Sequence, residues 1–158
     1  MFKNALKKLA ELLEAITPSV GKVVYWVKLP QTKQQEASLI GAPDSKAVQG
    51  CIIRINETSE IDKTSSGSIF QYLASATIGV YASYENATTF DSSRQEEFDT
   101  TLRNIVVALA DVHASRTTSD LGLSVETVDA IKNHGEGMYF GRQCLFAEIE
   151  ITIKVTLR

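Results

Sequence analysis

The sequence has few of the residues on which metal sites and catalytic sites usually depend. It contains only two cysteines, Cys51 and Cys144, and two histidines, His113 and His134. The cysteines are too few and too far apart for a disulfide framework, and none of the four residues has a second cysteine or histidine at metal-ligand spacing. We therefore expect buried, unpaired thiols and no bound metal ion.

Long apolar runs are missing too. No run approaches the roughly 20 residues that a membrane-spanning helix needs. Near the N-terminus, Glu11 and Glu14 interrupt the apolar residues, so the sequence predicts no signal-peptide core. Hydrophobic residues at 44% and charged residues at 22% are typical of a globular protein. We expect a domain that is made in the cytoplasm, remains in water and has no membrane partner.

Basic residues are not in excess. The formal net charge is −3 and the sequence pI is about 5.4. A surface that neutralises phosphate groups usually gives a basic balance. We therefore expect no sequence-specific nucleic acid as a partner, although these totals do not address a local basic patch.

Motifs of nucleophilic catalysis and phosphate binding are absent from the sequence. It has no Gly-x-Ser-x-Gly elbow and no Walker sequence, and residues 135–137 (Gly-Glu-Gly) lack the following glycine of a nucleotide fingerprint. These glycines are typical of a hairpin. A triad assembled only in space would leave no such trace. We expect neither histidine to support chemical turnover, and His113 near a helix C-terminus suits the helix dipole.

Two carboxylates near the C-terminus share one strand face. Glu148 and Glu150 could in principle act as an acid/base pair, but Lys154 and Arg158 follow on the same face. This mixture favours a solvated charge ladder or one that contacts a neighbouring subunit. No catalytic residue is assigned.

The apolar periodicity predicts two helices in a single domain that spans residues 1–158. The first helix covers residues 2–16 and ends before Pro18; the second follows cap candidates at 91–93 and ends in the polar stretch 113–120. Their apolar stripes predict the residues that pack against the sheet. These are Leu6, Leu9, Leu13, Phe98, Leu102, Ile105 and Leu109.

Five segments alternate or cluster as β-strands do. They are residues 23–29, 51–56, 70–84, 122–132 and 142–158, separated by a long loop at 30–50, a polar loop at 57–68 and a glycine-bearing loop at 133–141. The order helix, three strands, helix, two strands predicts an α+β fold. Hairpin-like connections favour a mostly antiparallel sheet with both helices on one face.

The lengths of two strands call for an explanation. Residues 70–84 and 142–158 would each extend on the order of 50 Å at about 3.3 Å per residue, whereas a domain of this size has a radius of gyration near 15 Å. Either bulges bend these strands or their ends project and pair with a neighbouring subunit by strand addition. Self-assembly is the favoured interpretation.

Charge along the last strand suggests where copies meet. Glu148 and Glu150 precede Lys154 and Arg158, so we expect these four residues at a subunit interface where an acidic patch meets the basic patch of the next copy. The loop at 30–50 has too little apolar content for a core of its own, and we expect it to become ordered at an interface.

The leading helix, the central β segments, the helix sequence FDTTLRNIVVAL and the ending GRQCLFAEIEITIKVTLR resemble the phage tail terminator (tail completion) family. The resemblance implies a ring, usually a hexamer, that caps the tail tube and meets the head connector. It implies a virion protein of the tail neck, assembled in the host cytoplasm, whose partners are its own copies, the tail tube protein and a head connector or neck protein. It implies no cofactor and no reaction.

Two other classes of function fit the sequence. A small-molecule-binding or enzymatic α+β domain would need a concave pocket with convergent polar groups. An adaptor subunit of a bacterial secretion system would assemble by the same ring logic with a different partner. The sequence does not separate the second class from a phage component.

Overall fold

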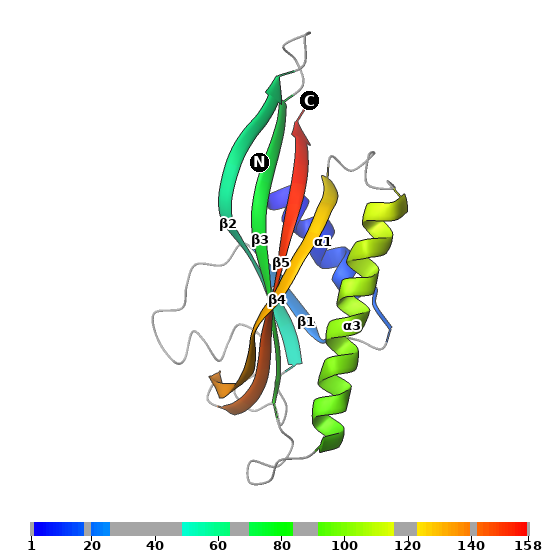
Figure 1. The fold of residues 1–158 in the computed structure, drawn as a ribbon, viewed down its shortest axis with the longest axis vertical. Coiled ribbons are helices and arrows are strands. Elements are labelled where there is room, and N and C mark those ends of the chain that lie inside the picture. Colours follow the sequence, from blue (N-terminus) through cyan, green and yellow to red (C-terminus); the bar gives the residue numbers. More distant parts are fainter. Residues whose placement is uncertain are drawn as a thin grey trace.

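The structure is a computed structural model, and it describes residues 2–17, 20–25, 49–63, 70–83, 92–115, 123–139 and 142–157. Its elements are helix α1 (Phe2–Glu14), strands β1 (Lys22–Tyr25), β2 (Gln49–Lys63) and β3 (Phe70–Ser83), helix α3 (Ser92–Ser115), and strands β4 (Leu123–Tyr139) and β5 (Arg142–Leu157) (Figure 1). The predicted α+β class and the order α-β-β-β-α-β-β are confirmed.

The strands form one sheet in the order β1-β2-β3-β5-β4. All neighbours are antiparallel except β1 and β2, which run parallel. A parallel pair needs a crossover connection, and residues 26–48, which lie outside the described residues, join these two strands. The predicted loop at 30–50 is too long by two residues, because Gln49 and Gly50 already belong to β2.

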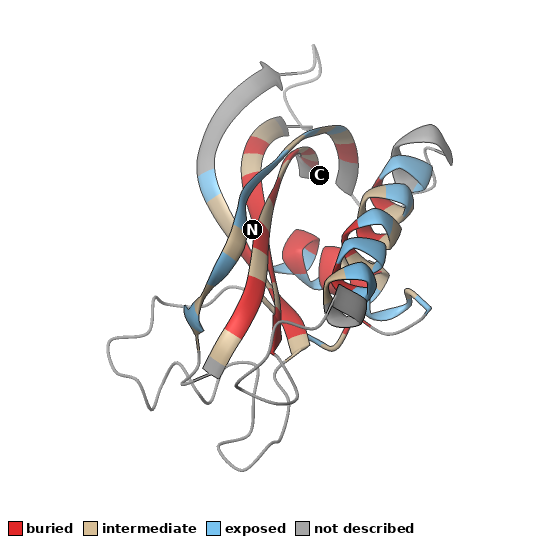
Figure 2. Ribbon diagram, turned by 60° about the horizontal axis from the view of Figure 1, so that its bottom comes forward, coloured by how far each residue is buried: buried red, intermediate tan, exposed pale blue. Residues whose placement is uncertain are grey.

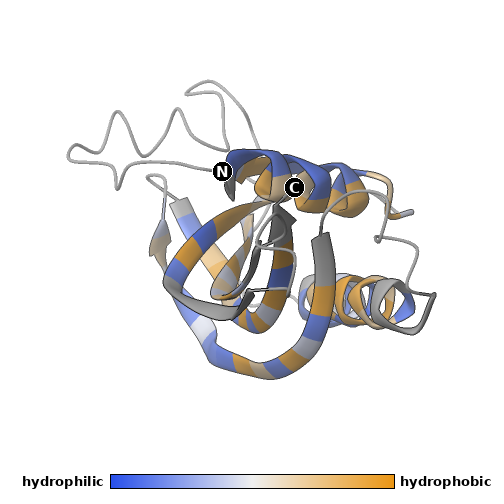
Figure 3. Cartoon of the chain, turned by 90° about the horizontal axis from the view of Figure 1, so that it is seen from above, coloured by the Kyte–Doolittle hydropathy of each residue, from blue (hydrophilic) through white to orange (hydrophobic). Residues whose placement is uncertain are grey.

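Both helices cover the concave face of the curved sheet (Figure 3). All seven predicted helix positions, from Leu6 to Leu109, are buried, which confirms the predicted stripes. Between helices and sheet lies one hydrophobic core (Figure 2). The sheet's contribution to it is Val23, Cys51, Ile53, Ala74, Ala76, Ile78, Val80, Ala82, Val125, Leu145, Ala147, Ile149, Ile151, Ile153 and Val155.

The chain leaves α1 through a tight approach to the sheet. The backbone amide of Ile16 donates to the carbonyl of Leu13 at 3.2 Å, a three-residue step that tightens the last turn. Gly21 then adopts a positive φ of 89°, and a Cβ there would lie 2.1 Å from the carbonyl oxygen of Gln49. Only glycine fits at this position, which brings β1 beside the start of β2.

Two segments predicted as loops are strands. Residues 57–63 continue β2, although their composition is polar, because they pair with β3 through two register shifts. Residues 133–139 continue β4 as far as Tyr139, which pairs with Arg142. In both segments the backbone pairing with a neighbouring strand outweighs the local preference of polar residues and glycine for loops.

Strand β4 carries three register shifts, and they explain its unusual sequence pattern. Val125, Val128 and Ile131 lie opposite Ile153, Ile151 and Ile149, so β4 advances three residues for every two of β5. Each β-bulge places two residues opposite one and increases the local twist. The last shift contains Asn133, whose φ is 51°.

The predicted strand addition by the terminal strand is wrong. β5 lies inside the sheet and pairs with β3 from Cys144 to Leu157 and with β4 from Arg142 to Val155, so its backbone is occupied on both sides. Its length is accommodated differently. The sheet curves, and the ends of β2, β3 and β5 extend beyond the helices (Figure 1). We call this extension the projecting arm.

Substitutions on α3 test the packing of this helix. We expect Leu102→Ala to lower the free energy of unfolding by about 2–5 kcal/mol in urea denaturation, because Leu102 is only 4% exposed. Val107→Ala is the matched control on the same helix, since Val107 is 49% exposed and its loss should change stability by about 0.5 kcal/mol or less. Equal losses in the two variants would contradict the orientation of α3.

Candidate functional site: the outer face of the sheet

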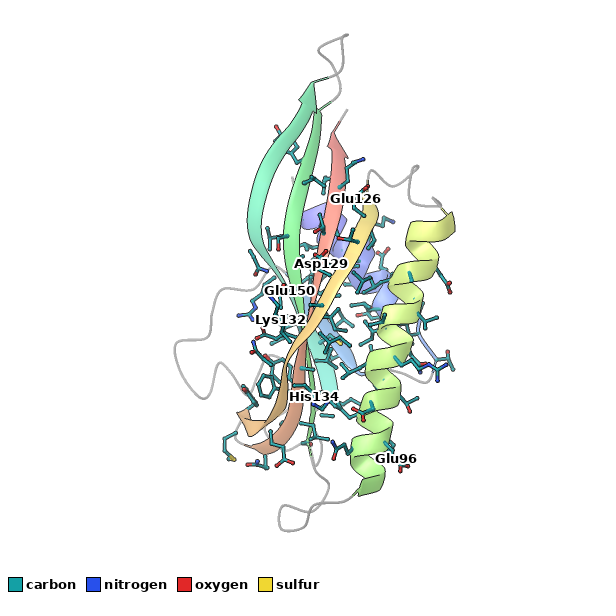
Figure 4. All side chains as sticks on the ribbon, viewed as in Figure 1. Glu96, Glu126, Asp129, Lys132, His134 and Glu150 are labelled. Atoms are coloured by element: carbon teal, nitrogen blue, oxygen red, sulfur yellow. The ribbon has the colours of Figure 1, made fainter. Side chains whose placement is uncertain are left out.

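The sheet face opposite the helices carries a row of polar side chains across its central strands, which we call the charge ladder. Figure 4 labels four of its members on β4 and β5. It comprises Arg54, Glu126, Thr127, Asp129, Lys132, Asn133, Glu148, Glu150, Thr152 and Lys154. The ladder exists because alternate residues of β5 are buried in the core, which turns the intervening ones outward.

Three charged residues of β5 each face an opposite charge on a neighbouring strand: Glu148, Glu150 and Lys154. Lys132 Nζ lies 2.9 Å from Glu150 Oε2, and Lys154 Nζ lies 3.4 Å from Glu126 Oε1. Glu148 Oε1 lies 3.8 Å from Arg54 Nη2, on the other side of β5. Glu148, Glu150 and Lys154 are therefore each paired with an opposite charge within the subunit.

Neutral side chains complete the ladder. The Asn133 amide donates to Glu148 Oε2 at 3.0 Å, and the Thr152 hydroxyl donates to Asp129 Oδ2 at 3.0 Å. The Thr127 hydroxyl donates to the other carboxylate oxygen of Asp129. The bulges of β4 make this possible, because two β4 residues stand beside each outward residue of β5.

The carboxylates of the ladder stabilise the protonated, charged form of Lys132. The pKa of Lys132 lies above its usual value because Glu150 accepts its hydrogen bond and attracts its charge, with a smaller attraction from Asp129. Lys132 is exposed, so solvent and salt screen these interactions. The pairs fix side-chain positions more than they stabilise the fold.

The structure separates the two carboxylates considered as an acid/base pair. Glu148 pairs with Arg54, whereas Glu150 pairs with Lys132, so each has its own cation. Lys154 pairs with Glu126, and the side chain of Arg158 lies outside the described residues. A subunit contact through these four residues stays a prediction, but the described charges are interleaved with partners rather than segregated into two patches.

An aromatic patch adjoins the ladder on the same face. The ring centroids of Tyr81 and Tyr139 are 5.2 Å apart, and those of Tyr139 and Phe146 are 4.8 Å apart. The buried Cys144 lies in this cluster, packed with Val24, Ile52, Tyr81 and Tyr139. The sequence alone does not reveal this patch, because its three aromatic residues come from three different strands.

Glycines give the tyrosine rings their space. A Cβ at Gly137 would lie 2.8 Å from the Tyr139 ring, and one at Gly79 would lie 3.1 Å from the Tyr81 ring. Each ring folds back over the glycine two residues earlier on its strand. The pattern Gly-x-Tyr in a strand is thus the available signal for the patch, and here the glycines serve packing rather than a loop.

His134 lies on β4 and faces helix α3 (Figure 4). Its Nε2 is 3.2 Å from Asp99 Oδ1, and its ring centroid is 5.9 Å from that of Phe98. This contact ties the edge strand to the helix. His113 lies within α3 close to its end at Ser115, as the sequence predicted, and its side chain is outside the described part. Among the described residues, no group of three or more His, Cys, Asp or Glu side chains could hold a metal ion.

Both thiols are buried and neither forms a disulfide bond, which confirms that prediction. Burial raises the pKa of Cys51 to about 12. Cys144 donates a weak hydrogen bond from Sγ to the carbonyl oxygen of Tyr139 at 3.6 Å. Because the thiolate is the nucleophile, neither residue is placed to react.

Thiol labelling tests this burial. We expect neither cysteine of the folded protein to react with an aromatic disulfide reagent, even at about pH 10, where an unperturbed thiol with a pKa near 8.5 is ionised. In urea both should react. Because the folded pKa of Cys51 is raised, its contribution to stability is present below about pH 8.5 and is lost as the pH rises towards 12. Rapid modification of one thiol in the folded protein would contradict its burial.

Comparisons with known proteins give no family for the chain. No family model matches it, and no curated protein is significantly similar to it. Within the described residues, no helix is both long enough and apolar enough to cross a membrane.

Proposed function

We propose that this chain is a structural subunit of a ring that terminates a phage tail tube and joins it to the head connector. The proposal rests on the resemblance of its helix α3 and its terminal strand to the tail terminator family. Its action is stoichiometric: copies close a ring, one side of the ring stops tube growth, and the other presents a docking surface.

The observation that carries the proposal is the one-sided covering of the sheet. Both helices lie on the concave face (Figure 3). The outer face presents the charge ladder and the aromatic patch. The projecting arm extends the sheet past the helices (Figure 1). A subunit whose sheet is supported from one side keeps a rigid surface for contacts with neighbours.

The native mass in solution is the first test. We expect light scattering to give about six times the 17.3 kDa of the chain, and negative-stain images to show rings. Addition of the rings to polymerising tail tube protein of the same source should stop tube growth. A protein that stays monomeric at all concentrations, with and without the tube protein, would overturn the proposal.

A charge swap tests whether the ladder contributes to the ring. Lys132→Glu combined with Glu150→Lys keeps an ion pair within the subunit but inverts its direction on the outer face. We expect the unfolding midpoint to stay close to that of the wild type, while assembly weakens at low salt and recovers towards the wild-type level near 1 M salt.

The matched control is the single variant Glu150→Gln, which removes the pair without presenting a reversed charge. We expect it to assemble better than the swap at low salt. If the swap assembles like the wild type at low salt, the ladder lies outside the subunit interface.

A further inference from the structure

We infer that neighbouring copies in the ring contact each other when the β4–β5 hairpin of one copy inserts Met138 into a groove between α1 and α3 of the next copy. This inference rests on the proposed function. Two surfaces on each chain carry the inference. One is the exposed apolar side chain of Met138 on the paired β4–β5 hairpin. The other is an open groove whose lining is also largely apolar. The occupant is therefore a second copy of this chain.

The groove lies where the end of α1 meets the middle of α3. It encloses about 500 Å³ and is lined by Leu12, Ala15, Ile16, Thr17, Asn104, Val107, Ala108 and Asp111. Leu12 and Ile16 are half-buried, whereas Ala15 is exposed and the larger Val107 is 49% exposed. An apolar side chain from outside would remove this surface from water.

Met138 is the apolar side chain that we place in this groove, and we call it the knob. It is 66% exposed, the largest fraction among the exposed large hydrophobic residues of the described chain. It stands next to the end of β4, on a hairpin that is paired from Gly135 with Phe146 to Tyr139 with Arg142. On the other face of the hairpin, the Tyr139 ring of β4 packs against the Phe146 ring of β5. Methionine is flexible and adapts to irregular apolar gaps.

Charge next to the knob matches charge next to the groove. Glu136 lies two residues before Met138, on the same strand face, at about 7 Å along the strand. Arg103 lies one turn before Val107 on the exposed side of α3, at about 6 Å along the helix. The distance from Glu136 to Met138 along the strand is therefore close to the distance from Arg103 to Val107 along the helix. When Met138 of one copy contacts Val107 of the next, Glu136 lies beside Arg103 of that next copy. Asp111, one turn beyond Val107, disfavours the reversed orientation.

The end of β4 and the start of β5 turn away from α3 (Figure 1), whereas the residues that line the groove belong to the end of α1, the segment just after it and the middle of α3. One copy cannot fill its own groove in this arrangement. A knob and a groove at different places on one molecule make a heterologous contact, which closes into a ring when the rotation permits.

Cysteine crosslinking tests the contact directly, because the native Cys51 and Cys144 are buried and do not compete. Copies with Met138→Cys are co-assembled with copies carrying Val107→Cys and treated with a short thiol-specific crosslinker. We expect crosslinked dimers in the mixture and none with either variant alone. The control replaces Met138→Cys with Ile131→Cys, a 48% exposed residue of the same strand, which should not crosslink.

Charge reversal provides the second measurement. Arg103→Glu and Glu136→Arg should each weaken assembly about tenfold at low salt, and the double variant should recover most of this loss because the pair re-forms across the contact. A structural role of either residue within its own subunit would lower thermal stability and would not be rescued by the partner substitution.

The outcomes separate the two proposals. If the wild-type protein forms rings but the mixed variants give no crosslink, the contact of Met138 with the groove is wrong and the ring function stands. The same conclusion follows if the charge variants assemble like the wild type. Crosslinks with Met138→Cys alone show a symmetric hairpin contact and also overturn it. Wild-type protein that never assembles overturns both.

Discussion

The central position of β5 is the constraint on which the rest of the structure depends. Its residues alternate strictly, so six buried apolar side chains from Leu145 to Val155 form one strip, and the strand pairs with β3 and β4 at the same time. Burial of each large side chain stabilises the fold by about 1.5–3 kcal/mol. Both helices pack over the core that this strip completes, which leaves the intervening residues of β5 on the opposite face.

The charge ladder follows from the meeting of β5 with a bulged neighbour. β5 repeats every two residues and β4 every three, so extra polar residues of β4 are available beside each outward residue of β5. The result is a set of ion pairs and hydrogen bonds that cross from strand to strand. Such pairs give the outer face a fixed pattern of charge.

Register shifts also lie in the two strands that form the edges of the sheet. β4 forms one edge of the sheet, and β2 forms the other beyond the short stretch from Gly50 to Ile53 that β1 covers. Both β2 and β4 carry register shifts, and bulges of this kind are a common protection against edge-to-edge pairing. In the proposed ring, contacts through side chains of the faces and of the β4–β5 hairpin are therefore favoured over strand addition, and the backbone of β5 is already paired on both sides.

The sequence by itself determined the class, the order of elements and the helix stripes, because amphipathic periodicity depends on neighbours within one element. Leu102 and Ile149 are predictable in this way. It did not determine that residues 57–63 and 133–139 are strands, because the backbone hydrogen bonds that hold them come from β3 and β5, which local residue preferences do not reveal. Nor did it determine that Glu148 and Glu150 belong to different ion pairs, or that Tyr81, Tyr139 and Phe146 meet. Only the tertiary structure decides these contacts, since strand order and bulges set which distant residues lie side by side.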